Sequence, residues 1–336
     1  MLTTRFTSAF GLSHAIALAP MAHAAGGALA AAVARAGGLG LLGGGYGDAD
    51  WIDAEWARAN GAPIGIGFIT WALTRDVLDA ALARSPRAVM LSFGDPAPFA
   101  GAIHAQNIPM ICQCQTLDHA RAALNAGAQT LVAQGSEAGG HGATRGTLTL
   151  VPELADLIAD RAPQTLLLAA GGIADGRGLA AVLMLGADGA LVGTRLWAAS
   201  EALVPHGFQD AAVAATGDAT LRTKAPDAAR LLAWPDPFTI RVMRSGFTDR
   251  WHDDPATLRT DPAARAQWQV AQTAGDPVNG SPVAGESVAL IHDIRPAAAI
   301  LGKMTAEALA RLGAYACAAG VTHDGQNAGQ DVGATP

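Results

Sequence analysis

The chain has 336 residues, half of them hydrophobic, and a formal net charge of −7 at pH 7. This length suits one large α/β barrel with an appendage, because such barrels commonly occupy about 250 residues as a single domain. The negative charge without a basic cluster argues against nucleic acid as a partner, and no apolar run reaches the roughly 18 residues of a membrane span.

The cysteines and the N-terminal residues indicate in which cellular compartment the protein is expected. Cys112, Cys114 and Cys317 form no disulfide framework, and the first two lack further Cys or His at zinc spacing, so we expect no metal site. A basic start followed by an apolar stretch imitates a signal peptide, but His14 interrupts that stretch. We therefore expect a first barrel strand at residues 15–19 and a cytoplasmic protein.

Short apolar runs alternate with amphipathic, alanine-rich segments up to residue 203. The runs predict eight strands, at residues 15–19, 39–42, 64–68, 88–92, 109–114, 130–133, 166–170 and 190–192. Helical patterns lie between them, at residues 27–36, 75–83, 117–126, 151–161 and 178–185. Such alternation implies a parallel sheet of the α/β class, and eight units imply closure into a (β/α)8 TIM barrel. An open doubly wound sheet gives the same alternation, but glycines at several strand ends favour the barrel.

The alternation stops at residue 204, where prolines interrupt the chain and tryptophans gather. Helices are predicted at residues 211–216, 227–233 and 263–273, with no convincing strand between them. Two closing helices are predicted at 296–301 and 305–315. We therefore divide the chain into the barrel (1–203), a smaller, mainly helical substrate-side region (204–284), closing barrel helices (285–322) and a polar tail expected to be disordered (323–336).

A glycine-rich loop follows the sixth predicted strand and ends in one histidine, Gln134-Gly-Ser-Glu-Ala-Gly-Gly-His141. Glycines let the backbone approach a ligand closely, and histidine is the side chain best suited to moving a proton near neutral pH. The next two strand ends carry Gly171-Gly172 and Gly193-Thr194. Barrels commonly hold phosphate after the seventh and eighth strands, so the pattern predicts a phosphate cradle, aided by a helix N-terminus near Gly176, beside a catalytic base.

As a set, these motifs resemble those of the nitronate monooxygenase family, formerly called 2-nitropropane dioxygenases, which are FMN-dependent (β/α)8-barrel enzymes. Residues 134–141 resemble the loop that carries the family's active-site histidine. Ala170-Gly-Gly-Ile-Ala-Asp-Gly-Arg177 and Gly193-Thr-Arg195 resemble its flavin-phosphate segments, and residues 19–22 and 36–45 match its first two strand ends. The similarity runs from about residue 13 to about residue 252.

The resemblance implies FMN as cofactor and oxidation of alkyl nitronates by O2 to a carbonyl compound and nitrite; use of neutral nitroalkanes stays open. His141 would be the catalytic residue, which removes the acidic proton beside the nitro group or hydrogen-bonds its oxygens. Cofactor contacts are expected from Ala19, Pro20, Met21, Ala22, Gly67, Gln113, Gln134, Gly139, Gly140, Gly171, Gly172, Gly193 and Thr194.

Two strand ends raise further expectations. Gln113 and Gln115 share one face of the fifth strand, so Gln113 either hydrogen-bonds the flavin ring, where some relatives carry a lysine, or binds its barrel neighbours. The third strand end lacks the asparagine of many family members, which shifts flavin anchoring to Thr70 or backbone groups and leaves Trp71 to wall the substrate pocket. We expect Glu137 and Arg145 to be solvated or to lock their loop, and His119 to lie at the surface.

Two alternatives remain. An FMN-dependent enoyl-acyl-carrier-protein reductase shares the barrel and a similar Ala-Gly-Gly-His loop, but needs sites for NAD(P)H and a phosphopantetheine arm. The low lysine count and the inserted Trp234 and Trp251 favour the monooxygenase. A flavin-binding protein without turnover is disfavoured by the intact His141 loop. The expected partners are a small nitronate or nitroalkane and O2, with no nucleic acid or membrane; the oligomeric state is left open, a homo-oligomer included.

Overall fold

The protein was analysed as a computed structural model, which describes residues 2–318. Eight parallel strands form a barrel in the order β1-β9-β8-β6-β5-β4-β3-β2. Leu39 bridges to Ala17 of β1 and so links the two ends of the sheet. Every predicted barrel strand is present, with ends that differ by a few residues: β1 Ile16–Leu18, β2 Leu41–Gly45, β3 Gly65–Ile69, β4 Val89–Ser92, β5 Met110–Cys114, β6 Thr130–Gln134, β8 Leu166–Ala170 and β9 Gly189–Val192.

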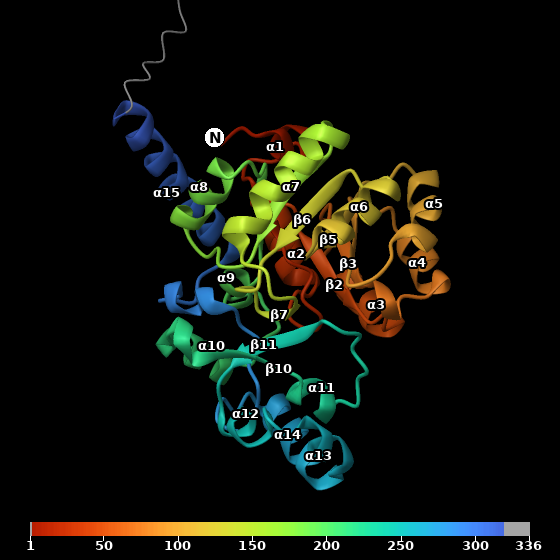
Figure 1. The fold of residues 1–336 in the computed structure, drawn as a ribbon, viewed down its shortest axis with the longest axis vertical. Coiled ribbons are helices and arrows are strands. Elements are labelled where there is room, and N and C mark those ends of the chain that lie inside the picture. The colour runs from red at the N-terminus through yellow and green to blue at the C-terminus, as the bar shows by residue number, and fades with distance from the viewer. Residues whose placement is uncertain (1, 319–336) are drawn as a thin grey trace, which may run out of the picture.

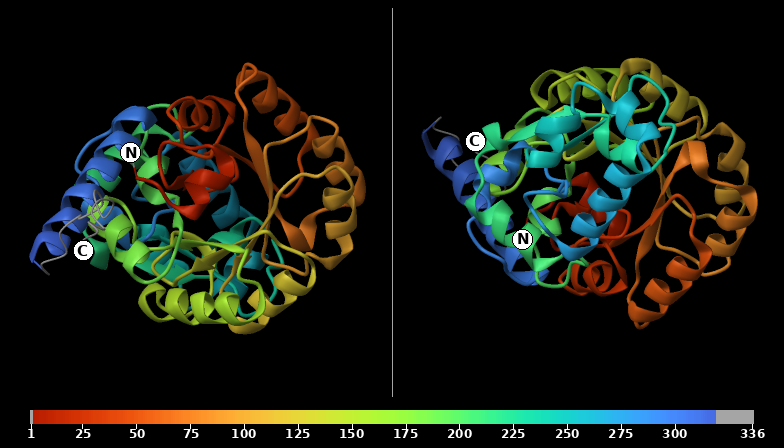
Figure 2. Two further views of the ribbon diagram at one scale, coloured as in Figure 1. Left: turned by 90° about the horizontal axis from the view of Figure 1, so that it is seen from above. Right: turned by 90° about the horizontal axis from the view of Figure 1, so that it is seen from below.

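Helices surround the barrel, as both views in Figure 2 show. They are α2 Gly27–Arg35, α3 Ala49–Arg58, α4 Arg75–Leu82, α5 Ala97–Ala105, α6 Leu117–Asn125, α7 Thr147–Arg161, α8 Gly176–Met184, α9 Thr194–Trp197 and α15 Ala297–Ala318. The side chains of Asp48, Thr74 and Thr116 cap α3, α4 and α6 by accepting from backbone N–H groups. The prediction of two closing helices is wrong, because α15 continues through Gly302 as one helix.

Helix α7 starts one turn earlier than predicted. The Glu137 carboxylate accepts a hydrogen bond from the Thr147 backbone N–H at 2.9 Å and another from its hydroxyl at 2.8 Å. This long-range cap satisfies a free N–H at the helix start, so Pro152 lies inside the helix instead of beginning it. The expected locking role of Glu137 is thereby confirmed.

The barrel interior is apolar and is plugged at its N-terminal end. Helix α1 (Arg5–Phe10) places Phe6 against the first residue of β9, and Phe6 is fully buried. Phe6 belongs to a cluster of inward-facing side chains from the strands, among them Leu41, Met90 and Leu168. The predicted first strand is confirmed, since β1 pairs in register with β9. No helix among residues 2–318 is long and apolar enough to cross a membrane.

The segment after the barrel strands packs over the carboxyl ends of the strands (Figure 1). Its helices are α10 His206–Ala214, α11 Ala225–Ala229, α12 Gly246–Trp251, α13 Pro255–Thr260 and α14 Pro262–Ala274, with short 3-10 turns at Gly217–Ala219 and Glu286–Leu290. A further 3-10 turn, Thr70–Ala72, follows barrel strand β3. The expectation that it holds no strand is wrong. Strands β10 (Thr220–Thr223) and β11 (Thr239–Met243) form an antiparallel sheet with β7 (Gly140–Gly142). The insert is therefore fastened to the histidine loop.

Two of the helices predicted in the insert have other ends in the structure. The first insert helix, α10, begins earlier than the predicted 211–216, whereas α14 covers the predicted 263–273. Helix α11 stops at Ala229 instead of continuing to 233, because residues 231–237 turn through Leu231 in a left-handed conformation and two prolines. The tail at 323–336 and the side chain of Cys317 lie outside the described residues.

Candidate active site

One cavity of about 850 Å³ opens at the carboxyl ends of the barrel strands, beneath the insert. The predicted catalytic residue and the thirteen predicted cofactor contacts all line this cavity: Ala19, Pro20, Met21, Ala22, Gly67, Gln113, Gln134, Gly139, Gly140, His141, Gly171, Gly172, Gly193 and Thr194. These residues come from six different strand ends or loops, which the barrel topology brings to one face. The structure thus gives them one shared space in which a ligand can contact them together.

The glycines at the ends of β8 and β9 leave free room in the cavity. Gly171 and Gly172 have φ values of +101° and +75°, which side-chain-bearing residues rarely adopt. A Cβ on Gly172 or Gly193 would lie 3.6 Å from its nearest neighbour, so it would project into the cavity without disturbing the wall. Thr194 adds a hydroxyl that accepts from the Gly285 N–H at 2.9 Å and retains its own proton to donate.

The expected contribution of the helix start near Gly176 is wrong. Asp175 accepts hydrogen bonds from the backbone N–H groups of Arg177 and Gly178, and Glu307 accepts from that of Gly176. Two carboxylates therefore already occupy the N-terminus of α8, where they are stabilised by the helix dipole. The strand-end glycines and the Thr194 hydroxyl remain as donors for an anionic ligand.

Three glutamines connect the strands below the histidine. The side-chain amides of Gln113 and Gln115 both donate to Oε1 of Gln134, at 3.1 and 2.8 Å. The amide of Gln134 donates to the backbone carbonyl of His141 at 3.0 Å. Gln113 and Gln115 thus share a face as predicted, and Gln113 both binds its neighbour and lines the cavity. His119 is half-buried and contacts Gln115 at 3.0 Å, so its predicted surface position is wrong.

Two arginines hold the loop between β6 and β7. Arg222 and Arg241 face each other across β10 and β11, and both donate to the carbonyl of Ser136, at 3.0 to 3.2 Å. Burial, followed by the positive charge of Arg241, lowers the pKa of Arg222 to about 10. Arg145 pairs instead with Glu153 on α7. The loop that ends at His141 is therefore fixed by the insert as well as by the barrel.

His141 lies in β7 opposite Ile240 of β11, and its side chain is 8% exposed. Its Nε2 is 2.9 and 3.1 Å from the two carboxylate oxygens of Asp227 on α11. Burial lowers the pKa of His141, an effect that the hydrogen bond and negative charge of Asp227 only partly oppose. The imidazole is consequently neutral at pH 7 and able to accept a proton.

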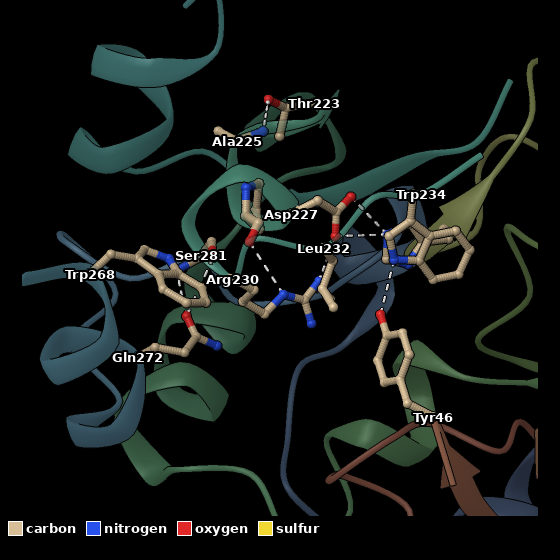
Figure 3. A network of polar contacts seen from close by, with 12 residues as sticks. Tyr46, Thr223, Ala225, Asp227, Arg230, Leu232, Trp234, Trp268, Gln272 and Ser281 are labelled. Carbon is tan, nitrogen blue, oxygen red and sulfur yellow. Dashed lines mark hydrogen bonds and ion pairs between the residues drawn. The ribbon is translucent and has the colours of Figure 1, made fainter. Parts of the chain in front are cut away.

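Aromatic side chains pack against part of the His141 ring. The indole of Trp234 stacks on the imidazole, with ring centroids 3.4 Å apart and planes 8° from parallel. Trp234 donates to the Tyr46 hydroxyl at 2.9 Å, and Figure 3 shows this pair beside Asp227 and Arg230. Phe93 packs edge-on against both His141 and Trp234. This cage keeps bulk water away from one face of the ring.

At the third strand end, Gly67, Phe68 and Ile69 line the cavity, so the predicted anchoring by backbone groups stays open, whereas the predicted roles of Trp71 and Thr70 are wrong. Trp71 packs edge-on against Tyr46 and Trp234, which line the cavity, so it supports the wall from behind. Thr70 is buried against Gly94 and lies outside the cavity lining. Residues that sequence reasoning missed are Tyr46, Phe93, Asp227 and Arg230. Phe93 directly follows one predicted strand and Tyr46 lies shortly after another, so their positions were a signal, whereas Asp227 and Arg230 follow no motif and only the gathering of tryptophans marked their region.

Comparison with known proteins places this arrangement in a family. A family model described as nitronate monooxygenase matches residues 70–307. The nitronate monooxygenase npaC of Metarhizium robertsii is 34% identical over 329 residues, which cover 88% of this chain and 90% of that protein. The chain belongs to the nitronate monooxygenase family.

Two solved structures extend the comparison beyond sequence. FabK from Thermotoga maritima has a TM-score of 0.80 and 28% identity, covering 94% of this chain and all of that one. A nitroalkane oxidase from Streptomyces ansochromogenes has a TM-score of 0.79 and 25% identity, covering 93% of this chain and all of that one. Nitronate monooxygenases are flavoenzymes. This member of the family is therefore an oxidoreductase on a TIM barrel.

Proposed function

We propose that this chain oxidises alkyl nitronates with O2 to a carbonyl compound and nitrite, and takes nitroalkanes where it can first remove their acidic proton. The observation that carries the proposal is the neutral, enclosed His141 in a cavity built from strand ends. Membership of the nitronate monooxygenase family supports the same chemistry. His141 is the catalytic residue of this proposal.

FMN is the cofactor that we propose for the cavity, and the residues present fit it. Its phosphate would lie against Gly172, Gly193 and Thr194, and a Cβ on either glycine would fill the required space. Its ring would lie near Met21 and Gln113, which line the same cavity. Bound FMN would supply the electron acceptor of the reaction.

The side chains perform the proton chemistry and the enclosure. With a nitroalkane, the C–H bond beside the nitro group breaks, its proton passes to His141, and the electron pair remains on the substrate as the nitronate. With a preformed nitronate no proton has to be removed, and His141 contacts the anion. Gln134 holds the backbone of His141 in place, while Trp234 and Phe93 exclude water and strengthen electrostatic interactions there.

An FMN-dependent enoyl-acyl-carrier-protein reductase is the second candidate. The cavity extends beneath the insert along four apolar side chains, Leu203, Phe208, Trp268 and Val283. Such a lining would accept an acyl chain, which favours the reductase as a candidate. A flavin-binding protein without turnover is the third candidate. It leaves unexplained why a carboxylate is buried against the histidine at the cavity wall.

The decisive comparison uses the purified protein with two reductants. We expect aerobic incubation with propionate 3-nitronate to release nitrite and consume O2, and anaerobic NADH to leave the flavin oxidised. Rapid reduction by NADH without nitrite release from the nitronate would establish the reductase instead. A flavin that responds to neither compound would establish the non-catalytic alternative.

A further inference from the structure

The carboxylate of Asp227 faces one nitrogen of the His141 ring and leaves the other free. Its Oδ2 lies 2.9 Å from Nε2, and its Oδ1 is held 2.7 Å from an Nη atom of Arg230. The Asp227 side chain is 6% exposed. Nδ1 of His141 forms no hydrogen bond with any residue from 2 to 318. This atom is not fully buried, and because His141 lines the cavity, the cavity reaches it.

A carboxylate paired with an arginine is ionised and has no proton to donate. The ring nitrogen that faces it must therefore carry the proton of the neutral imidazole, and the opposite nitrogen must present its lone pair. We propose that Asp227 is a positioning residue that holds the His141 proton on Nε2 and makes Nδ1 the proton acceptor of the site. This inference rests on the proposed function, in which His141 takes a proton from the substrate.

The consequence for proton transfer follows from the charges. When Nδ1 takes the substrate proton, the ring becomes an imidazolium whose Nε2–H bond to Asp227 is charge-assisted. Arg230 binds the Asp227 carboxylate, but its positive charge and that of Arg222 on β10 both disfavour the imidazolium. Tyr46, the other titratable side chain that faces this pair, is held neutral because burial raises its pKa. Among the charged side chains of residues 2–318 that act on the ring, Asp227 is thus the one that stabilises its protonated form.

Asp227→Asn separates this role from simple packing. The asparagine amide matches the shape of the carboxylate but can donate a hydrogen bond to Nε2, which transfers the ring proton to Nδ1 and removes the acceptor. Loss of the negative charge also lowers the pKa of His141 further, because the hydrogen bond and charge of Asp227 oppose the effect of burial. A residue that only supported the fold would change neither the tautomer nor this pKa.

The test is nuclear magnetic resonance of the purified protein with ¹⁵N-labelled histidine, in which His141→Asn identifies the His141 signals. At neutral pH we expect Nε2 of the wild type to be protonated and Nδ1 to be unprotonated. We expect the opposite tautomer and a lower pKa in Asp227→Asn. A wild-type ring protonated on Nδ1, or a tautomer and pKa unchanged in Asp227→Asn, would overturn the proposal.

Two more variants control the experiment. Asp227→Glu keeps the charge and should retain the wild-type tautomer. This variant tests whether the carboxylate sets the tautomer even if Asp227→Asn does not fold. Asp249→Asn removes an exposed carboxylate of the same insert, whose ion-pair partner among residues 2–318 is Arg244, and should leave the His141 signals unchanged. With a nitroalkane, kcat of Asp227→Asn should fall by about 10²–10⁴-fold. The acidic limb of its kcat–pH profile should move to lower pH. Absence of any nitronate turnover in wild type would refute the proposed function, while the spectra would still test Asp227.

Discussion

At the residue scale, the chemistry of His141 is set by groups from outside its own loop. Burial lowers the pKa of the ring, and Asp227, from the insert, opposes part of that effect. Trp234, from the same insert, covers one face of the ring. The histidine motif therefore supplies the base, whereas the insert determines its protonation and its access to water.

The strand-end glycines yield a prediction at this scale. In Gly193→Val, the Cβ would meet Ala19 at an ordinary contact distance of 3.6 Å, and the methyl groups would extend into the proposed phosphate space. We expect FMN affinity, measured by fluorescence titration, to fall about tenfold or more, because overpacking costs about 1–3 kcal/mol. Gly101→Val on the outside of α5 should leave affinity unchanged. Equal affinities in the two variants would contradict the phosphate site.

Much of the candidate site could be predicted because it belongs to strand ends. Short apolar runs locate those ends, and a barrel brings them to one face. Asp227 could not be found in this way, since it lies 86 residues from His141 in a short helix without a motif. Contacts of this kind depend on how the insert folds back, which local patterns do not encode.

At the element scale, Glu137 fixes both the start of α7 and the loop before β7. Glu137→Ala removes the acceptor of the Thr147 N–H, so we expect the free energy of unfolding to fall by about 0.5–2 kcal/mol. Urea denaturation measures this loss. The control is Glu153→Ala on the same helix, which breaks only a half-exposed ion pair with Arg145 and should cost less. A loss in the control as large as that in Glu137→Ala would contradict the capping role.

The strands of the insert show where element prediction fails. Strand β7 is a Gly-His-Gly segment with no periodicity, and it is a strand only because β11 pairs with it. Strand β11 alternates buried Ile240 and Val242 with arginine, but two prolines shortly before it obscured the pattern. Barrel strands were easier to recognise because burial on both faces makes them continuously apolar.

At the scale of the whole molecule, the two ends of the barrel have different tasks. The carboxyl ends of the strands carry the cavity, whereas Phe6 closes the opposite end. Phe6→Ala should lower the free energy of unfolding by about 3–5 kcal/mol through the hole it leaves, with flavin content unchanged. Leu309→Ala, at a partly exposed site on α15, should cost much less. Flavin loss in Phe6→Ala without a loss of stability would contradict this division.

The central claim is that this cavity holds a flavin that nitronates reduce. Anaerobic titration of the purified protein with propionate 3-nitronate, followed by its visible spectrum, tests that claim most directly. We expect a yellow protein whose flavin absorbance falls as nitronate is added and returns when O2 is admitted. A spectrum that stays unchanged through the titration, or a protein that binds no flavin at all, would contradict it.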